Sequence, residues 1–98
     1  MQSINDQQDN IRRWLRKQAE EACGHWFNEQ LKNLEARYYL YYKKGEIKVA
    51  EESPGPEWQL ASKKYISPAW PRSQAQQFIF NSLQGVEVLP DELIKGSC

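Results

Sequence analysis

Residues 8–36, QDNIRRWLRKQAEEACGHWFNEQLKNLEA, form the stretch that most constrains the fold. Apolar residues recur in it at steps of three or four from Ile11 to Leu34, and no proline interrupts them. This spacing is typical of an amphipathic helix, because residues three and four apart share a face at ~3.6 residues per turn. The sequence therefore predicts one long helix from Gln8 to Ala36.

The apolar stripe of this helix changes direction near Gly24. Ile11 and Leu15 fall on one side, whereas Trp26 and Phe27 are rotated from them by roughly a third of a turn, at ~100° per residue. Glycine is also a weak helix former. Two alternatives follow: the helix kinks near Gly24 and packs on its own sheet, or it stays straight, overhangs the domain and pairs with another chain.

The tyrosine-rich segment 38–51 alternates as a β-hairpin would. Lys44 and Gly45 provide a two-residue turn, which sets the register of the two strands. One face then carries two apolar pairs, Tyr42 with Ile47 and Leu40 with Val49. The other face carries a mixed polar surface, with Lys43 opposite Glu46, Tyr41 opposite Lys48 and Tyr39 opposite Ala50. The alternative is a helix that continues through Tyr42 and stops at Gly45.

The remainder of the chain predicts four shorter elements. A third strand spans 57–66, and a second helix spans 73–84, with Ser73 and Gln76 as a capping box and Gly85 after its end. A short strand follows over 86–89, and Pro90 opens a final helical turn. The expected fold class is α+β in a single domain, 1–98, with helices on one face of a three-stranded antiparallel sheet and loose ends at 1–7 and 96–98.

Composition excludes several functions. Thirteen basic and thirteen acidic residues leave no net charge to attract nucleic acid or membrane over the whole chain. One histidine and two cysteines are too few to complete a structural zinc site, and no glycine-rich phosphate loop is present. We therefore expect no enzyme activity, no cofactor and no metal. The absence of a long apolar run favours a cytoplasmic protein with reduced thiols that does not enter a membrane.

Aromatic residues supply the first hypothesis about function. Four Trp, five Tyr and three Phe are many for one small core, and large aromatics are favoured at interfaces. This abundance favours a protein–protein interaction or regulatory adaptor module that self-associates as a homo-oligomer. The candidate partner-binding residues are Trp14, Trp26, Tyr39, Tyr41 and Trp70. In the other interpretation, all four tryptophans belong to the core.

Two acid-free segments, 36–45 and 58–86, supply the alternative hypothesis. Basic residues interleaved with aromatics can hold phosphates while bases stack on the rings. The candidate nucleic-acid-binding residues are Arg37, Lys43, Lys44, Lys63, Lys64, Tyr65 and Arg72. A plain sheet surface, with strand-forming tyrosines and solubilising lysines, would show the same pattern. The element order is similar to that of double-stranded RNA-binding domains, but residues 73–77 lack a lysine cluster, so no family is assigned.

Overall fold

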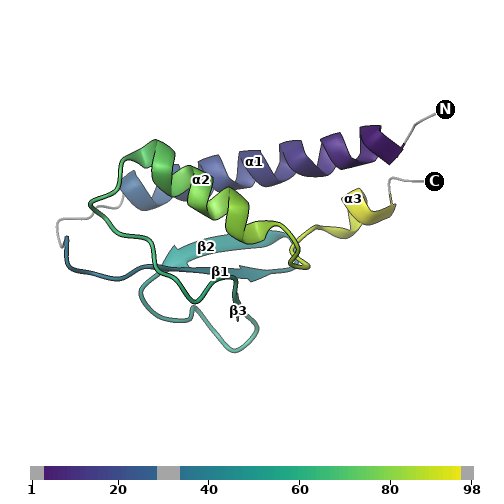
Figure 1. Ribbon diagram of the computed structural model, residues 1–98. Helices are drawn as coiled ribbons and strands as arrows, with labels where there is room; N and C mark the ends of the chain where they lie inside the picture. Colours follow the sequence, from purple (N-terminus) through teal and green to yellow (C-terminus); the bar gives the residue numbers. More distant parts are fainter. Residues whose placement is uncertain (1–3, 29–33, 96–98) are drawn as a thin grey trace.

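The computed structural model describes residues 4–28 and 34–95, and two helices cover one face of a small sheet in it (Figure 1). The chain order is α1 (Ile4–Asn28), β1 (Tyr39–Lys43), β2 (Glu46–Ala50), β3 (Gln59–Leu60), α2 (Arg72–Leu83) and α3 (Asp91–Lys95). The strands are antiparallel, in the order β2-β1-β3. The predicted α+β architecture is confirmed.

Helix α1 is shifted along the chain from its predicted range. It begins at Ile4 rather than Gln8, and Leu34 and Glu35 already form a turn, so the prediction of helix up to Ala36 was wrong. Residues 29–33, which the predicted helix also included, lie outside the described residues. The helix has to end early because β1 must return along the same core, and Ala36 is itself buried at the start of that return.

Gly24 does not interrupt α1, which is continuous from Ile4 to Asn28 and drawn as one coil in Figure 1. Of the two alternatives, the kink near Gly24 is therefore absent. Gly24 is buried where α2 begins, and a Cβ placed there would lie 2.6 Å from Nη2 of Arg72. The side chain missing at Gly24 leaves room for Arg72, which explains a glycine inside this helix, near its C-terminal end, without any bend.

The hairpin has the predicted register at every position, from Lys43 opposite Glu46 to Tyr39 opposite Ala50. Gly45 closes the turn with a φ of +78°, a conformation that glycine adopts without steric cost. The alternative of a helix through Tyr42 is therefore wrong. Leu40 is fully buried beneath the helices, and the side chains at the alternate positions Tyr39 and Tyr41 belong to the opposite face.

Strand β3 is much shorter than the predicted strand 57–66. It pairs with β1 only at Gln59 and Leu60, and pairing resumes at a single bridge between Tyr38 and Ile66. Leu60 lies opposite Tyr41, so an unbroken ladder would put residue 63 opposite Tyr38. Ile66 takes that place instead, which means that the chain bulges out by three extra residues (66 − 63). The prediction was wrong here because alternation alone cannot reveal a bulge.

Helix α2 begins one residue earlier than predicted, at Arg72, and its capping is different. Pro71 occupies the N-cap position without a side-chain cap, so the capping box expected at Ser73 does not form. The carbonyl oxygen of Pro71 accepts hydrogen bonds from the backbone N–H groups of Gln74 and Ala75 instead. Gly85 follows the helix with a φ of +88°, as its predicted place after the helix end requires.

The segment after α2 is not the strand predicted over 86–89. Val88 is buried there and accepts a single backbone hydrogen bond from the N–H of Gly45, at 2.8 Å. This contact ties the segment to the hairpin turn, and the predicted helical turn α3 follows it. No helix in the described part of the chain has both the length and the hydropathy needed to span a membrane.

The core lies between the two helices and the inner face of the sheet. Helix α1 contributes a nearly straight buried stripe of Leu15, Ala19, Cys23 and Trp26. The two rotated clusters expected from the sequence merge into this stripe because α2 and β2 both pack against α1. The other buried members come from the sheet, α2 and the segment after it: Leu40, Ile66, Ala75, Ile79, Phe80, Leu83 and Val88.

Candidate functional site

An open hollow of about 660 Å³ lies at the β3 side of the sheet, where the bulge meets α2. Arg37, Lys63 and Lys64 provide three positive charges around it. Four aromatic side chains and one hydroxyl complete its lining: Tyr39, Tyr65, Trp70, Phe78 and Ser67. No acidic side chain lines the hollow, so its charge is positive although the whole chain is neutral.

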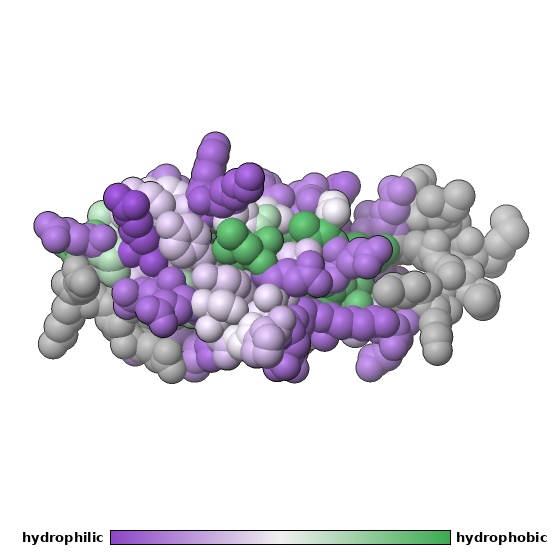
Figure 2. All heavy atoms as spheres, turned by 90° about the horizontal axis from the view of Figure 1, so that it is seen from below, coloured by the Kyte–Doolittle hydropathy of each residue, from purple (hydrophilic) through white to green (hydrophobic). Residues whose placement is uncertain are grey.

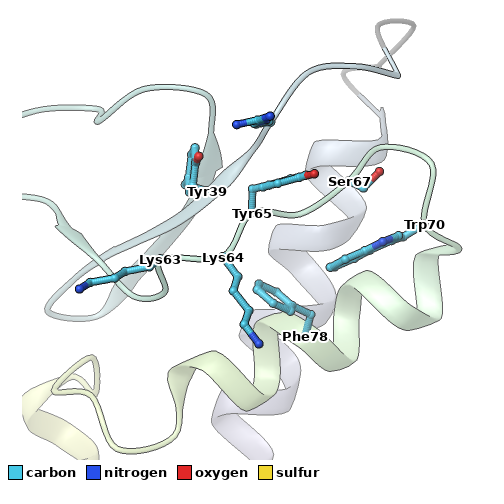
Figure 3. A pocket seen from close by; sticks show the side chains of 8 residues that line it. Tyr39, Lys63, Lys64, Tyr65, Ser67, Trp70 and Phe78 are labelled. Carbon is cyan, nitrogen blue, oxygen red and sulfur yellow. The ribbon is translucent and has the colours of Figure 1, made fainter.

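The bulge brings two of these charges to the hollow. Because the three extra residues lie between Leu60 and Ile66, the chain leaves the sheet there and exposes Lys63 and Lys64. Figure 3 shows Lys64 extending toward Phe78 on α2, whereas Lys63 points away from the aromatic side chains. Lys64 is therefore the lysine that extends to the aromatic lining.

Tyr65 is held in a defined orientation by two neighbours. The Arg37 guanidinium lies over its ring, with Cζ 5.2 Å from the ring centroid. The ring of Tyr39 approaches it edge-on, with centroids 6.3 Å apart. Tyr65 itself is 40% exposed. Its ring thus has a fixed position and accessible surface, as a binding side chain requires.

Trp70 is held on the other side of the hollow by a tight turn. Its backbone N–H donates to the carbonyl oxygen of Ser67, at 3.1 Å, and the N–H of Ala69 donates to the Ser67 hydroxyl oxygen, at 3.2 Å. The Trp70 ring meets Phe78 edge-on, with centroids 5.3 Å apart. Pro68 lies inside this turn, and Pro71 directly follows Trp70. The turn and the ring contact together restrict Trp70.

The other predicted basic residues lie elsewhere. Lys43 is 3.7 Å from a Glu46 carboxylate oxygen and 3.6 Å from one of Glu57, and its amine lies 4.9 Å from the ring centroid of Trp58. Lys44 forms an ion pair with Asp91 of α3. These two lysines are at the hairpin turn, next to carboxylates, and do not belong to the hollow.

Arg72 is also separate from the hollow. Its guanidinium packs against Gly24 on α1, and its carbonyl oxygen accepts a hydrogen bond from the Cys23 thiol, at 3.5 Å. By contrast, Arg37, Lys63 and Lys64 form no ion pair with any acidic residue in the described part of the chain. The structure therefore brings together three of the six predicted basic residues, and none of those three has a carboxylate partner there.

The predicted partner-binding residues are scattered over the fold. Trp26 is buried in the core, where its ring meets Phe27 and Tyr38 edge-on. Trp14 is half-buried on α1 and does not line the hollow. Tyr41 lies on the outer face of the sheet, between Lys48 and Leu60 on the neighbouring strands. Only Tyr39 and Trp70 line the hollow. These five residues do not form one surface.

Two lining residues, Ser67 and Phe78, were not among the predicted site residues. Phe78 lies on α2, and only the packing of this helix beside the bulge brings its ring to the hollow. Ser67 precedes Pro68, and that pair is a turn signal that sequence analysis could have used to place Trp70. The contact that brings Phe78 to the hollow joins segments distant in the chain, and no local sequence pattern indicates it.

The apolar surface on the underside of the molecule is small. Figure 2 shows apolar residues near the centre of this face in limited areas, separated and bordered by hydrophilic ones. Within residues 8–28 and 34–93, only three large apolar or aromatic side chains are strongly exposed, namely Leu34, Leu60 and Tyr65. A face of this kind suits a charged or polar ligand better than an extended apolar one.

Two titratable groups, one in the core and one packed against it, have raised pKa values. Burial raises the pKa of the Cys23 thiol above its ordinary value of 9.0, although the positive charge of Arg72 acts in the opposite direction. Loss of hydration also raises the pKa of Tyr38 above 10.0, and the Glu51 carboxylate adds to that shift. Cys23 is thus a protonated, buried thiol at neutral pH and a poor nucleophile.

No protein-family model matches the chain, and no curated protein or solved structure matches it either. Within residues 4–28 and 34–95, no group of three His, Cys, Asp or Glu side chains could hold a metal ion. The fold and the hollow define a small α+β protein with a basic, aromatic surface site.

Proposed function

We propose that this protein is a non-enzymatic binding module that holds single-stranded nucleic acid at the hollow. The observation that carries this proposal is the lining itself. Three positive charges without carboxylate partners in the described chain surround four aromatic rings, and no acid interrupts them. Lysine and arginine side chains neutralise phosphates, while the faces of aromatic rings stack on unpaired bases.

The shape of the hollow favours a single strand over a duplex. It is open and lies at the edge of a sheet, so an extended strand can pass across it without a deep channel. A duplex keeps its bases stacked on one another and offers mainly phosphates to a surface of this size. The four rings would then have nothing to stack on.

The test compares two matched pairs of lysines by fluorescence anisotropy with a labelled single-stranded oligonucleotide at low salt. Lys63→Gln with Lys64→Gln removes two charges at the hollow, whereas Lys43→Gln with Lys44→Gln removes two charges that already pair with carboxylates. We expect the first pair to weaken binding about tenfold or more and the second to change it little. Affinity should also fall steeply as salt is raised.

The proposal is wrong if the wild-type chain does not bind single-stranded DNA or RNA at low salt. It is also wrong if both lysine pairs weaken binding equally, since that would mean a diffuse charge effect rather than a site. Replacing lysine by glutamine keeps the length of the side chain and lowers the net charge by the same amount in both double variants. Any difference in affinity between the two double variants is therefore due to where the lysines lie and not to the net charge.

A protein–protein interaction and self-association module is the second candidate function. Its support is the N-terminal end of α1, which extends past α2 and the strands in Figure 1. Ile11 and Trp14 on the same helix pack against the core but are only half-buried. A helix of 25 residues is ~37 Å long at ~1.5 Å per residue, which exceeds the two shorter dimensions of the molecule, 29 and 21 Å, but not the longest one, 50 Å. A second chain placed against this end would cover apolar area that α2 does not reach.

A further inference from the structure

We infer that the hollow holds one unpaired base of a single strand between the rings of Tyr65 and Trp70, and that Lys64 binds a phosphate beside it. This inference rests on the proposed function and names the contact by which a base is retained. Figure 3 shows Tyr65 on one side of the hollow and Trp70, with Phe78, on the other. The volume of about 660 Å³ is ample for one base and its sugar phosphate.

The first wall of this slot is Tyr65. Arg37 covers one face of its ring and Tyr39 contacts its edge, so the opposite ring face is the one left for a ligand. A guanidinium over one face of the ring also places a positive charge close to the bound strand. Tyr65 would therefore serve as a stacking platform next to a phosphate-binding charge.

The second wall is Trp70. Its position is determined by the hydrogen-bonded turn that begins at Ser67 and by the edge-on contact with Phe78. Indole offers the largest stacking surface among the side chains of proteins. Because the turn precedes Pro71 and α2, Trp70 keeps its place when no ligand is bound.

The two walls come from segments that already pack on the same core. Tyr65 directly precedes Ile66, which is buried and bridges to Tyr38, while Trp70 lies beside a helix whose residue Ile79 is buried. Neither wall needs to order on binding, so little conformational entropy is lost when a base enters. The two rings are held in place before a ligand binds, and this distinguishes the site from a chance cluster of surface aromatics.

The decisive experiment separates the base from the phosphate. Affinity is measured for a short oligothymidylate and for an oligomer of the same length that carries abasic residues, which keep the phosphates but lack the rings. Stacking should make the intact oligomer bind about 5- to 150-fold tighter than the abasic one. Tyr65→Leu and Trp70→Leu should each bring this ratio close to one, and circular dichroism confirms that each variant folds.

Two further variants make the result specific. Lys64→Gln should weaken binding of both oligomers by the same factor and leave their ratio unchanged, because it removes a phosphate contact only. Trp58→Leu is the matched control, since Trp58 packs with Lys43 outside the hollow and should leave the ratio at its wild-type value.

The outcomes are distinct. Equal binding of intact and abasic oligomers would overturn the base slot but leave the proposed nucleic-acid function standing. A ratio that survives Tyr65→Leu, which changes an exposed side chain, would also overturn the slot. If neither oligomer binds, both the slot and the proposed function are wrong.

Discussion

The Arg72 guanidinium occupies the space that a side chain on Gly24 would fill, with Nη2 2.6 Å from the position of an added Cβ. This relationship joins the C-terminal part of α1 to the first turn of α2, where the Cys23 thiol also donates to the Arg72 carbonyl oxygen. The glycine that suggested a kink in the sequence is therefore a contact point between two helices. Its replacement tests that interpretation directly.

Gly24→Ala should stabilise the protein. The added methyl group would displace only the end of a flexible and exposed arginine, while alanine gains about 1 kcal/mol over glycine in a helix. We expect the thermal midpoint to rise by about 4 °C or more. Gly85→Ala is the matched control and should destabilise, because its φ of +88° is unfavourable for any residue with a Cβ. A loss of stability in Gly24→Ala would contradict this prediction and would mean that the Arg72 guanidinium cannot move aside for the methyl group.

Two leucines on neighbouring strands should respond very differently to truncation. Leu40 on β1 is 0% exposed, whereas Leu60 on β3 is 46% exposed. Leu40→Ala removes buried methyl groups and leaves a cavity, so it should lower the free energy of unfolding by about 2–5 kcal/mol. Leu60→Ala should change it by less than about 1 kcal/mol. Urea denaturation of both variants checks this, and similar losses would mean that the sheet face is wrongly assigned.

The protein should lose stability in alkaline solution, beginning near pH 9. The folded pKa values of Cys23 and Tyr38 are raised above their ordinary values of 9.0 and 10.0. As the pH rises past those values, the unfolded chain releases protons that the folded chain still holds, and this favours unfolding. The stability contribution is thus complete below pH 9 and is lost as the pH passes through the folded pKa.

A cysteine variant tests how much of the loss of stability at alkaline pH is due to Cys23. In a background with Cys98 replaced by serine, Cys23→Ala should reduce the slope of stability against pH above 9, whatever it does to stability at pH 7. In the same background, Cys23 should react slowly with a thiol reagent in the native state and fully in urea. Fast labelling of the native protein would show that Cys23 is accessible.

Self-association through α1 predicts that solution mass depends on protein concentration. Light scattering over a dilution series should show a dimer that dissociates, and Trp14→Ala should weaken its association by about 30-fold if Trp14 is an interface anchor. Trp58→Ala changes a ring that contacts Lys43 and does not belong to α1, so it should leave the association unchanged. A wild-type chain that remains monomeric at high concentration would remove the second candidate function.

Local patterns were sufficient for much of the fold. The alternation of Leu40 and Tyr42 with their neighbours, together with a glycine in the turn, determines the hairpin register, because a shift of one residue would turn the apolar side chains outward. Helical periodicity likewise located α1 and α2. The ends of elements were less predictable, as the early start of α1 at Ile4 and the missing capping box at Ser73 show.

For the site, the sequence determined the ingredients, and only the tertiary structure decided the grouping. Acid-free segments containing Arg37, Lys63, Lys64 and Tyr65 are visible in the sequence. Which lysines face carboxylates and which face aromatic rings depends on the three-residue bulge and on the packing of α2 beside it. The physical reason is range: hydrophobic period and turn chemistry act between residues close in the chain, whereas a bulge and a surface hollow arise where distant segments compete for the same core.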